Sequence, residues 1–189
     1  MAVRFAAIGL NHDHIYGMTD QLLGAGGELT AFHAAEDDLA ARYAARFPQA
    51  KRVADPRAIL EDAAVSLVLT AAVNADRAAI CEAAMRHGKD ALTDKPGVVS
   101  FDQLAALRAA HAETGRRCIV HFSERVSQPA TAKAEELVKA GAIGRVINTV
   151  GLGPHRMRPA GRPDWFFRRA RSGGILADIA AHQFDQFLA

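Results

Sequence analysis

Short apolar runs of strand length alternate along this chain with alanine-rich segments whose apolar positions recur at helical spacing. Such runs predict parallel strands that are buried on both faces and connected by helices. The predicted strands are Arg4 to Ile8, Glu28 to His33, Val65 to Thr70, Asp90 to Thr93, Cys118 to Phe122 and Arg145 to Leu152. The repeated order of strand, helix and strand therefore predicts an α/β protein.

Helix-capping residues and a shift in composition indicate where helices begin and end and where one domain gives way to the next. Ser100 and Gln103 match a capping box at a helix start, and three glycines predict helix ends, namely Gly88, Gly115 and Gly141. The composition shifts near residue 121, after which one helix and a long strand precede an arginine-rich loop and a last helix. We expect a Rossmann-type doubly wound parallel sheet over residues 1–121 and the start of a second α/β domain over residues 122–189.

The bulk composition favours a folded globular protein, because 50% of the residues are hydrophobic and 23% are charged. A formal net charge of +2 gives no support for a nucleic-acid or membrane-surface binder. Cys81 and Cys118 lack metal-ligand spacing and predict reduced thiols. The N-terminal apolar run is too short for a signal peptide, and no segment has the length of a membrane span. We therefore expect a cytoplasmic protein.

The turn after the first predicted strand is a candidate dinucleotide site. Gly9 fits the first position of a GxGxxG pattern, whereas Asn11 and His14 stand where the other two glycines would be. His12 and His14 could face a pyrophosphate or the substrate, or Asn11 or Asp13 could simply cap the following helix. A metal site at His12-Asp13-His14 is disfavoured, because ligands so adjacent rarely converge without a further group.

The acid that usually holds the adenosine ribose is displaced. Ala34 stands at its usual position after the second strand, and Glu36 or Asp37 is the candidate substitute. The same acids could instead cap the next helix. The sequence leaves open whether the cofactor is NAD or NADP.

A lysine follows the predicted strand Asp90 to Thr93, at the sheet edge where open α/β proteins bind ligands. Pro96 favours an extended backbone at Lys95. A lysine there can donate a hydrogen bond to a substrate hydroxyl or stabilise its alkoxide. The alternative is a solvated surface lysine beside a turn proline.

A predicted helix over residues 173–185 carries ionisable groups on one face. Asp178, His182 and Asp185 follow i, i+4 and i+7 spacing amid apolar residues. Imidazole titrates near neutral pH, and a carboxylate one turn away can fix its tautomer, which suits a proton carrier. A hydrogen-bonded core histidine with two surface acids is the alternative.

These motifs resemble those of the Gfo/Idh/MocA family of NAD(P)-dependent oxidoreductases, and the resemblance covers the whole chain. Asp94-Lys95-Pro96 is similar to the family's Glu-Lys-Pro signature. The segment from Gly173-Gly174 to Asp178 and His182 is similar to its Gly-Gly, Asp, His signature. Further similarities are the loop Thr70-Ala71-Ala72-Val73-Asn74 over the nicotinamide, with Arg77 where a histidine is usual, and Arg125 and Pro129 after the sixth strand.

The resemblance implies an open second sheet that floors the substrate site and often mediates oligomerisation. Family members continue beyond this chain, so that sheet is expected to be C-terminally incomplete here and the full-length protein to be a homo-oligomer. Lys95 would orient the reacting hydroxyl, His182 would be the general acid or base, and Asp178 would bind substrate or support the histidine. The implied reaction transfers a hydride between NAD or NADP and a secondary alcohol of a sugar, cyclitol or sugar acid.

The expected site contains three groups of residues. The catalytic group is Lys95, His182 and Asp178. The cofactor-binding group is Gly9, Asn11, His12, His14, Glu36, Thr70, Ala72, Asn74, Asp94 and Lys95. The substrate-binding group is Arg125, His155 and Asp178, and we expect no metal site.

The loop over residues 155–171 leaves two readings open for its charged and its aromatic residues. Its arginines are Arg156, Arg158, Arg162, Arg168, Arg169 and Arg171. They could recognise a carboxylate or phosphate, or form a solvated loop or a subunit contact. Trp165, Phe166 and Phe167 are expected to anchor the loop in a core, with an aromatic wall for a sugar ring as the alternative.

Two other functions stay open. A noncatalytic nucleotide- or sugar-binding protein of the same fold would account for the altered glycine turn and the displaced acid. A metal-dependent lyase or hydrolase would use His155, Asp178 and His182, which are suitable ligand types.

Overall fold

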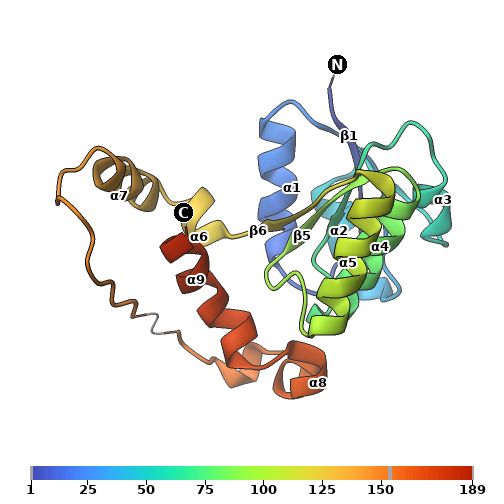
Figure 1. Ribbon diagram of the computed structural model, residues 1–189. Coiled ribbons are helices and arrows are strands. Elements are labelled where there is room, and N and C mark those ends of the chain that lie inside the picture. Colours follow the sequence, from blue (N-terminus) through green and yellow to red (C-terminus); the bar gives the residue numbers. More distant parts are fainter. Residues whose placement is uncertain (1, 153–154, 189) are drawn as a thin grey trace.

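The computed structural model describes residues 2–152 and 155–188 (Figure 1). The strands are β1 (Arg4–Ile8), β2 (Glu28–His33), β3 (Lys51–Arg52), β4 (Leu67–Thr70), β5 (Asp90–Asp94) and β6 (Cys118–His121). The helices between them are α1 (His14–Gly24), α2 (Asp37–Arg46), α3 (Arg57–Leu60), α4 (Asn74–Arg86) and α5 (Phe101–Thr114). The later helices are α6 (Ser123–Val126), α7 (Pro129–Lys139), α8 (Arg169–Ser172) and α9 (Ala181–Leu188). Short 3-10 turns cover Pro159–Gly161 and Asp164–Phe167, and a π-helical turn covers Leu176–Ala180.

All six strands are parallel and lie in the order β3-β2-β1-β4-β5-β6. The order reverses between β1 and β4, which is where doubly wound sheets open a ligand crevice at the carboxyl ends of their strands. The predicted Rossmann-type sheet is therefore confirmed. Only the two-residue edge strand β3 was missed, because its exposed Lys51 and Arg52 carry no apolar signal.

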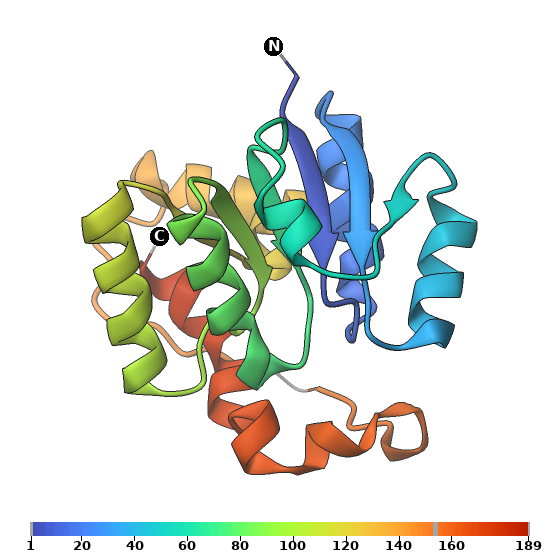
Figure 2. The same cartoon turned by 90° about the vertical axis from the view of Figure 1, so that its right-hand side faces the viewer.

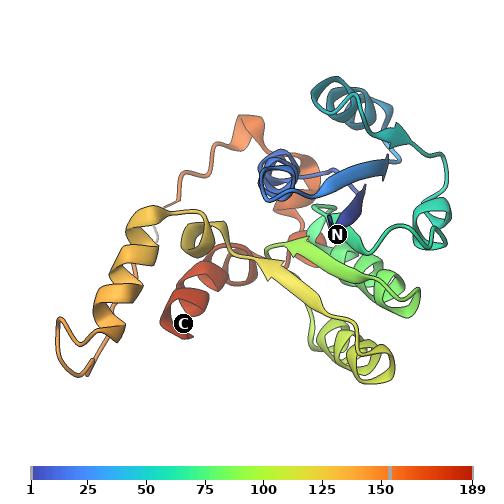
Figure 3. The ribbon, with the colours of Figure 1, turned by 90° about the horizontal axis from the view of Figure 1, so that it is seen from above.

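Helices cover both faces of the sheet, and alternate residues of β1 face opposite layers. Phe5 and Ala7 pack in the cluster that α1 and α2 complete. Ala6 and Ile8 pack in the cluster beneath α3, α4 and α5. Figure 3 shows α1 and α2 on one side of the sheet and α4 and α5 on the other. These two apolar layers fix the strand ends that carry the candidate site.

The helix boundaries follow the predicted punctuation. Ser100 accepts a hydrogen bond from the backbone N–H of Gln103 at 3.2 Å and caps α5. At the other end of α5, Gly115 takes a left-handed conformation with φ of 68°, as the predicted stop requires. No helix in residues 2–152 and 155–188 is both long and apolar enough to cross a membrane.

The strand predicted over residues 145–152 is wrong. This segment is irregular, and Ile147 and Val150 are exposed. A strand needs a neighbour for its backbone hydrogen bonds, and no strand is present in the described residues beyond β6. The alternation of apolar residues is present, but residues 2–152 and 155–188 contain no second sheet that this segment could join.

The last helical segment begins later than predicted. Gly173 and Gly174 both have left-handed φ angles near 80°, so helical turns start only at Ile175. The π-helical turn over Leu176–Ala180 then precedes α9. Figure 1 shows α6, α7 and α9 lying beyond β6, apart from the helices that cover the sheet.

Candidate active site

The turn after β1 is held close to the end of β4. Gly9 has a φ of 78°, and a Cβ added there would lie 2.6 Å from the Cβ of Ala72. The Gly9 N–H donates to the carbonyl of His33, and the His12 N–H donates to the carbonyl of Ala71. Only glycine tolerates both this backbone conformation and this close approach. The first glycine of the pattern thus keeps its structural role.

Asn11 and Glu36 form a contact that the sequence did not indicate. The amide Nδ2 of Asn11 donates to Oε1 of Glu36 at 2.8 Å. Asp13 makes no side-chain capping bond; instead Nδ1 of His12 accepts the backbone N–H of His14 at 3.2 Å. Capping of α1 by Asn11 or Asp13 is therefore not observed, and the carboxylate of Glu36 lies beside the turn.

A cavity of about 720 Å³ opens between this turn and the 155–172 segment. Its lining includes Asn11, His12, His14, Glu36, Arg42, Arg162, Trp165 and Phe166. Figure 2 shows the 155–172 segment running beneath the carboxyl ends of the strands. Trp165 and Phe166 are half-buried and Phe167 is 52% exposed, so the prediction that they anchor a core is wrong. Two of these aromatic rings form a wall of the cavity.

Asp94 lies at the centre of a buried polar cluster. Nδ1 of His14 donates to its Oδ1 at 3.0 Å, and Nδ1 of His12 lies 3.5 Å from its Oδ2. Nη2 of Arg77 lies 3.2 Å from Oδ2 as an ion pair, but out of alignment for a hydrogen bond. Burial would raise the pKa of Asp94, but the His14 hydrogen bond and the Arg77 charge outweigh it and lower that pKa to about 2.

Burial also sets the protonation of His12. It is the largest influence and lowers the pKa of His12 to about 3, against the opposing attraction of Asp94. His12 is therefore neutral at physiological pH. Its 3.5 Å approach to Asp94 is a contact between an uncharged ring and a carboxylate, not an ion pair.

Arg77 is the functional-site residue whose role the sequence missed. It is fully buried on α4, and its guanidinium donates to the carbonyls of Ala72 at 2.7 Å, Asp94 at 3.2 Å and Lys95. These bonds tie the end of β4 to the end of β5. The only signal was a cation in the motif where a histidine is usual, and nothing in the local pattern indicated burial.

Lys95 is buried and paired rather than solvated. Its Nζ donates to Oδ1 of Asp178 and to the Asp178 backbone carbonyl, both at 2.9 Å. The lysine is 4% exposed and the aspartate 5% exposed. The structure thus joins the two sequence motifs. The carboxylate of Asp178 faces Lys95, so its predicted support of His182 is not observed.

His182 lies beside this pair in a largely apolar setting. Its ring is edge-on to Phe122 with centroids 6.0 Å apart, and its Nε2 lies 3.9 Å from Oε1 of Glu124. Nδ1 has no hydrogen-bond partner among the described residues. Burial is the main cause that lowers the pKa of His182, so the ring is neutral at physiological pH and can accept a proton.

Three predicted binding residues have structural partners instead. Arg125 forms a two-bond ion pair with Asp185 at 2.6 and 3.0 Å, joining α6 to α9. Asn74 is buried and donates to the carbonyl of Ser172 at 2.9 Å. The side chain of Thr70 accepts the N–H of Ala72 at 3.2 Å within its own loop. The structure therefore gives Arg125 and Asn74 contacts that position elements, and their binding roles stay predictions.

His155 is exposed and lies near both the arginine loop and α9. It lines one cavity with Arg156 and Arg162 and another, of about 480 Å³, with Glu124 and Gln183. Among the described residues, the histidines, cysteines and acids that converge closely enough for a metal are His12, His14 and Asp94. The alternative metal site at His155, Asp178 and His182 is not assembled.

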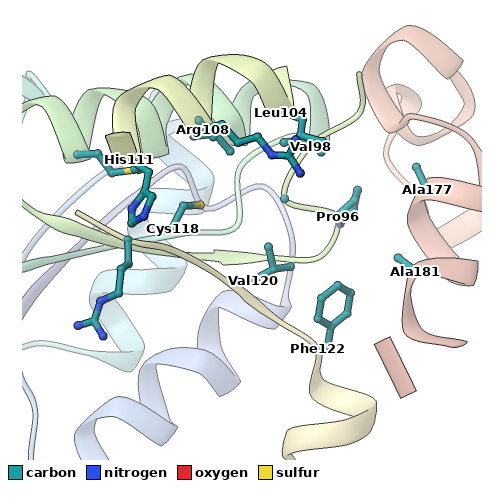
Figure 4. Close-up of a pocket in the computed structure, with 14 residues that line it drawn as sticks. Pro96, Val98, Leu104, Arg108, His111, Cys118, Val120, Phe122, Ala177 and Ala181 are labelled. Carbon is teal, nitrogen blue, oxygen red and sulfur yellow. The ribbon is translucent and has the colours of Figure 1, made fainter. Parts of the chain in front are cut away.

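An apolar cavity of about 780 Å³ lies next to the segments that carry the Lys95–Asp178 pair and His182. Figure 4 shows Pro96, Val120 and Phe122 on one side and Ala177 and Ala181 on the other. Pro96 adjoins Lys95, and the two alanines adjoin Asp178 and His182. The cavity thus adjoins the backbone that carries Lys95, Asp178 and His182.

Two family models match the chain. Residues 3–122 match the oxidoreductase family with an NAD-binding Rossmann fold, and residues 131–189 match the Gfo/Idh/MocA C-terminal domain. Levoglucosan dehydrogenase from Pseudarthrobacter phenanthrenivorans is 32% identical over 80% of this chain and 39% of its own length. The NAD-dependent scyllo-inositol 2-dehydrogenase of Bacillus subtilis is 31% identical over 69% of this chain and 36% of its own length.

Solved structures of oxidoreductases are also similar to this chain. A protein from Erwinia carotovora atroseptica is 44% identical, with a TM-score of 0.95 over 98% of this chain and 56% of that one. A levoglucosan dehydrogenase in complex with NADH is 25% identical, with a TM-score of 0.85 over 98% of this chain and 53% of that one. The chain therefore spans less than two thirds of the length of each of these relatives.

Proposed function

The chain belongs to the Gfo/Idh/MocA family of oxidoreductases, and on that premise we propose that it is the cofactor-binding and catalytic part of an NAD(P)-dependent dehydrogenase. Its substrate would be a secondary alcohol of a sugar, cyclitol or sugar acid. One observation carries the proposal: Lys95 at the end of β5 pairs with Asp178 beside the buried, neutral His182. We also propose residues 1–121 and 122–189 as the two domains.

The turn after β1 fits a dinucleotide. Gly9 lets the backbone bend without a side chain, and α1 directs its N-terminus to the cavity that His12 and His14 line. The positive end of a helix dipole favours a pyrophosphate there. Glu36 lies at the same cavity, where its carboxylate can accept hydrogen bonds from ribose hydroxyls. Bound NAD would accept the hydride that leaves the alcohol carbon.

Lys95 would bind the hydroxyl group of the substrate, and His182 would exchange a proton with it. The ammonium of Lys95 can orient the hydroxyl and stabilise negative charge on its oxygen. The neutral ring of His182 can take the hydroxyl proton, and it returns a proton in the reverse reaction. Asp178 holds the lysine in place. Oxidation of the alcohol would balance as one hydride to the bound nicotinamide and one proton to His182.

The first experiment is titration of the purified protein with NADH while the fluorescence of Trp165 is recorded. Trp165 is the only tryptophan in the chain and lines the cavity with Glu36. We expect saturable quenching with energy transfer from the indole to the dihydronicotinamide. Trp165→Phe should abolish the transfer while NADH's own emission still reports binding. A folded sample that binds neither NADH nor NADPH would instead favour the noncatalytic sugar-binding alternative.

The preference between the two cofactors is tested at Glu36. A carboxylate beside the ribose repels the 2′-phosphate of NADPH, so we propose NAD(H) as the preferred cofactor. Glu36→Gln should narrow the difference between the two dissociation constants, chiefly by improving NADPH binding. Unchanged affinities for both cofactors would remove Glu36 from the ribose site. Asp62→Asn, at an exposed carboxylate remote from this cavity, is the matched control.

Turnover separates the catalytic roles from cofactor binding. Lys95→Met and His182→Asn should each lower kcat by about 10²–10⁴-fold, while NADH affinity changes little. Lys133→Met, at an exposed lysine on α7, serves as the control. Unchanged turnover of either site variant would refute its proposed role, and NADH binding without any turnover would support the noncatalytic alternative.

A further inference from the structure

A second cluster of ligand-type side chains lies beside the proposed catalytic pair. His12 and His14 come from the turn that starts α1, and Asp94 comes from the end of β5, 80 residues further along the chain. One ligand atom from each lies within 4.8 Å of the others. We propose that these three residues bind a late divalent transition-metal ion such as Zn²⁺ or Co²⁺.

The separations between the ligand atoms fit a metal centre. Nδ1 of His14 and Oδ1 of Asp94 are 3.0 Å apart, and Nδ1 of His12 lies 3.5 Å from Oδ2. Ligands about 2.1 Å from a shared ion, at octahedral to tetrahedral angles, are themselves separated by about 3.0–3.5 Å. Each histidine nitrogen thus lies at a coordination spacing from one Asp94 oxygen, and the three ligand atoms would have to draw together from within 4.8 Å of one another to share an ion.

One carboxylate oxygen of the cluster lacks a hydrogen-bond donor. Oδ2 of Asp94 is buried and, within the described part of the chain, accepts no hydrogen bond. Its neighbour at 3.5 Å is Nδ1 of His12, which accepts the backbone N–H of His14 and therefore carries no proton that it could donate to Asp94. Two acceptors that face each other without a proton between them are stabilised by a cation.

Protonation and the neighbouring charge of Arg77 decide which cation fits. Nδ1 of His14 donates to Asp94 in the metal-free state, so a metal can bind this nitrogen once the proton moves to Nε2 of the same ring. Arg77 already neutralises much of the Asp94 charge. Mg²⁺ and Ca²⁺ depend on charged oxygen ligands, whereas two imidazoles suit Zn²⁺, Co²⁺ or Ni²⁺.

The site is open on one side. His12 and His14 both line the 720 Å³ cavity, which gives an ion an entry path and leaves coordination positions for water or a ligand. The proximity of two histidines in sequence argued against a metal, because a further group was missing. The fold supplies that group as Asp94.

Metal binding is tested on the untagged protein without nicotinamide, so that its outcome is independent of the proposed function. Co²⁺ is titrated into metal-free protein, with visible d–d absorption and calorimetry as readouts. We expect a stoichiometry of one Co²⁺ ion per chain, from both the d–d absorption and the heat of binding.

Variants locate the ion. His14→Ala and the double variant His12→Ala with His14→Ala should weaken Co²⁺ binding more than the roughly 10–100-fold that changes around a metal's ligands cost. His111→Ala, at an exposed histidine on α5, should bind Co²⁺ as the unaltered protein does. Circular dichroism confirms folding of each variant. No stoichiometric binding, or equal binding by the double variant, would overturn the proposal.

Discussion

The two parts of the chain bury apolar side chains to very different extents. Residues 2–122 supply both hydrophobic clusters around the sheet, and Phe5, Phe32 and Leu69 are completely buried. Beyond residue 122, among the described residues, Ile179 is the only buried hydrophobic side chain. Exposed hydrophobic residues there include Ile147, Val150, Leu152, Leu176, Phe184 and Leu188. Hydrophobic burial therefore stabilises the first part far more than the second.

Polar contacts attach the second part to the first. Asp178 pairs with Lys95, the carbonyl of Ser172 accepts from Asn74, and Arg171 pairs with Asp76. All three contacts reach the loops and helix that follow β4 and β5. The difference teaches that apolar burial builds the scaffold, whereas a few hydrogen bonds decide where His182 and Asp178 stand relative to it.

Arg77→Met should have the largest effect, because it removes the ion pair of Asp94 and the donor for four backbone carbonyls in the scaffold, those of Ala72, Asp94, Lys95 and Pro96. Breaking a buried pair on one side typically costs about 3–5 kcal/mol. Urea unfolding of the variant measures this loss. Arg86→Met on the same helix, where the guanidinium is exposed, should change the midpoint little. Equal shifts in the two variants would mean that the buried network does not stabilise the sheet.

The core comparison is tested directly with two leucines. Leu69→Ala in β4 empties a fully buried position and should cost about 2–5 kcal/mol. Leu176→Ala, at a side chain that is 75% exposed, should change the free energy of unfolding by less than about 0.5 kcal/mol. Both values come from the same urea titration. A large loss at Leu176 would show that the second part buries this side chain in solution, against another copy or another segment.

The same contrast explains what the sequence could predict. Strands β1, β4 and β5 were found because strands buried on both faces carry continuous apolar runs. Lys95 and His182 were singled out because motifs place them at a strand end and on a helix where ligands bind, and their catalytic roles stay predictions. The strand over residues 145–152 was wrong because local alternation does not supply a pairing partner.

Polar contacts between residues far apart in the sequence were the second feature that could not be predicted from the sequence. The burial of Arg77 depends on two strand ends that come together only in the fold. Likewise, the pairing of Arg125 with Asp185 could not be separated from a substrate-binding role by spacing alone. The approach of Asp94 to His12 and His14 also required tertiary structure.

Acid should destabilise the first part through its buried histidine. The pKa of His12 is about 3 in the folded protein against 6.5 in the unfolded chain, so the unfolded chain binds the extra proton between these values. Stability is therefore complete above pH 6.5 and falls as the pH drops towards 3, by at most about 1.4 kcal/mol per pH unit. Asp94, with its pKa lowered to about 2, adds a loss below pH 4.

The measurement is urea unfolding at several pH values between 7 and 4. His12→Asn removes the titrating ring and should flatten the dependence of the free energy of unfolding on pH. A slope equal to that of the unaltered protein would show that His12 is not the group responsible.

Arg171→Ala should have the smallest effect on global stability. Its effect should be confined to α8 and α9. Its guanidinium forms two bonds to Asp76, at 2.8 and 2.6 Å, but both side chains are over 40% exposed. Such pairs contribute less than about 1 kcal/mol. The Asn74 and Lys95 contacts persist in the variant, so we expect faster amide hydrogen exchange in α8 and α9 with an almost unchanged unfolding midpoint. Arg169→Ala, on the exposed side of α8, is the control. A fall in global stability comparable to that of Leu69→Ala would mean that the two parts unfold as one cooperative unit, and that the polar contacts stabilise the scaffold as well as positioning the second part.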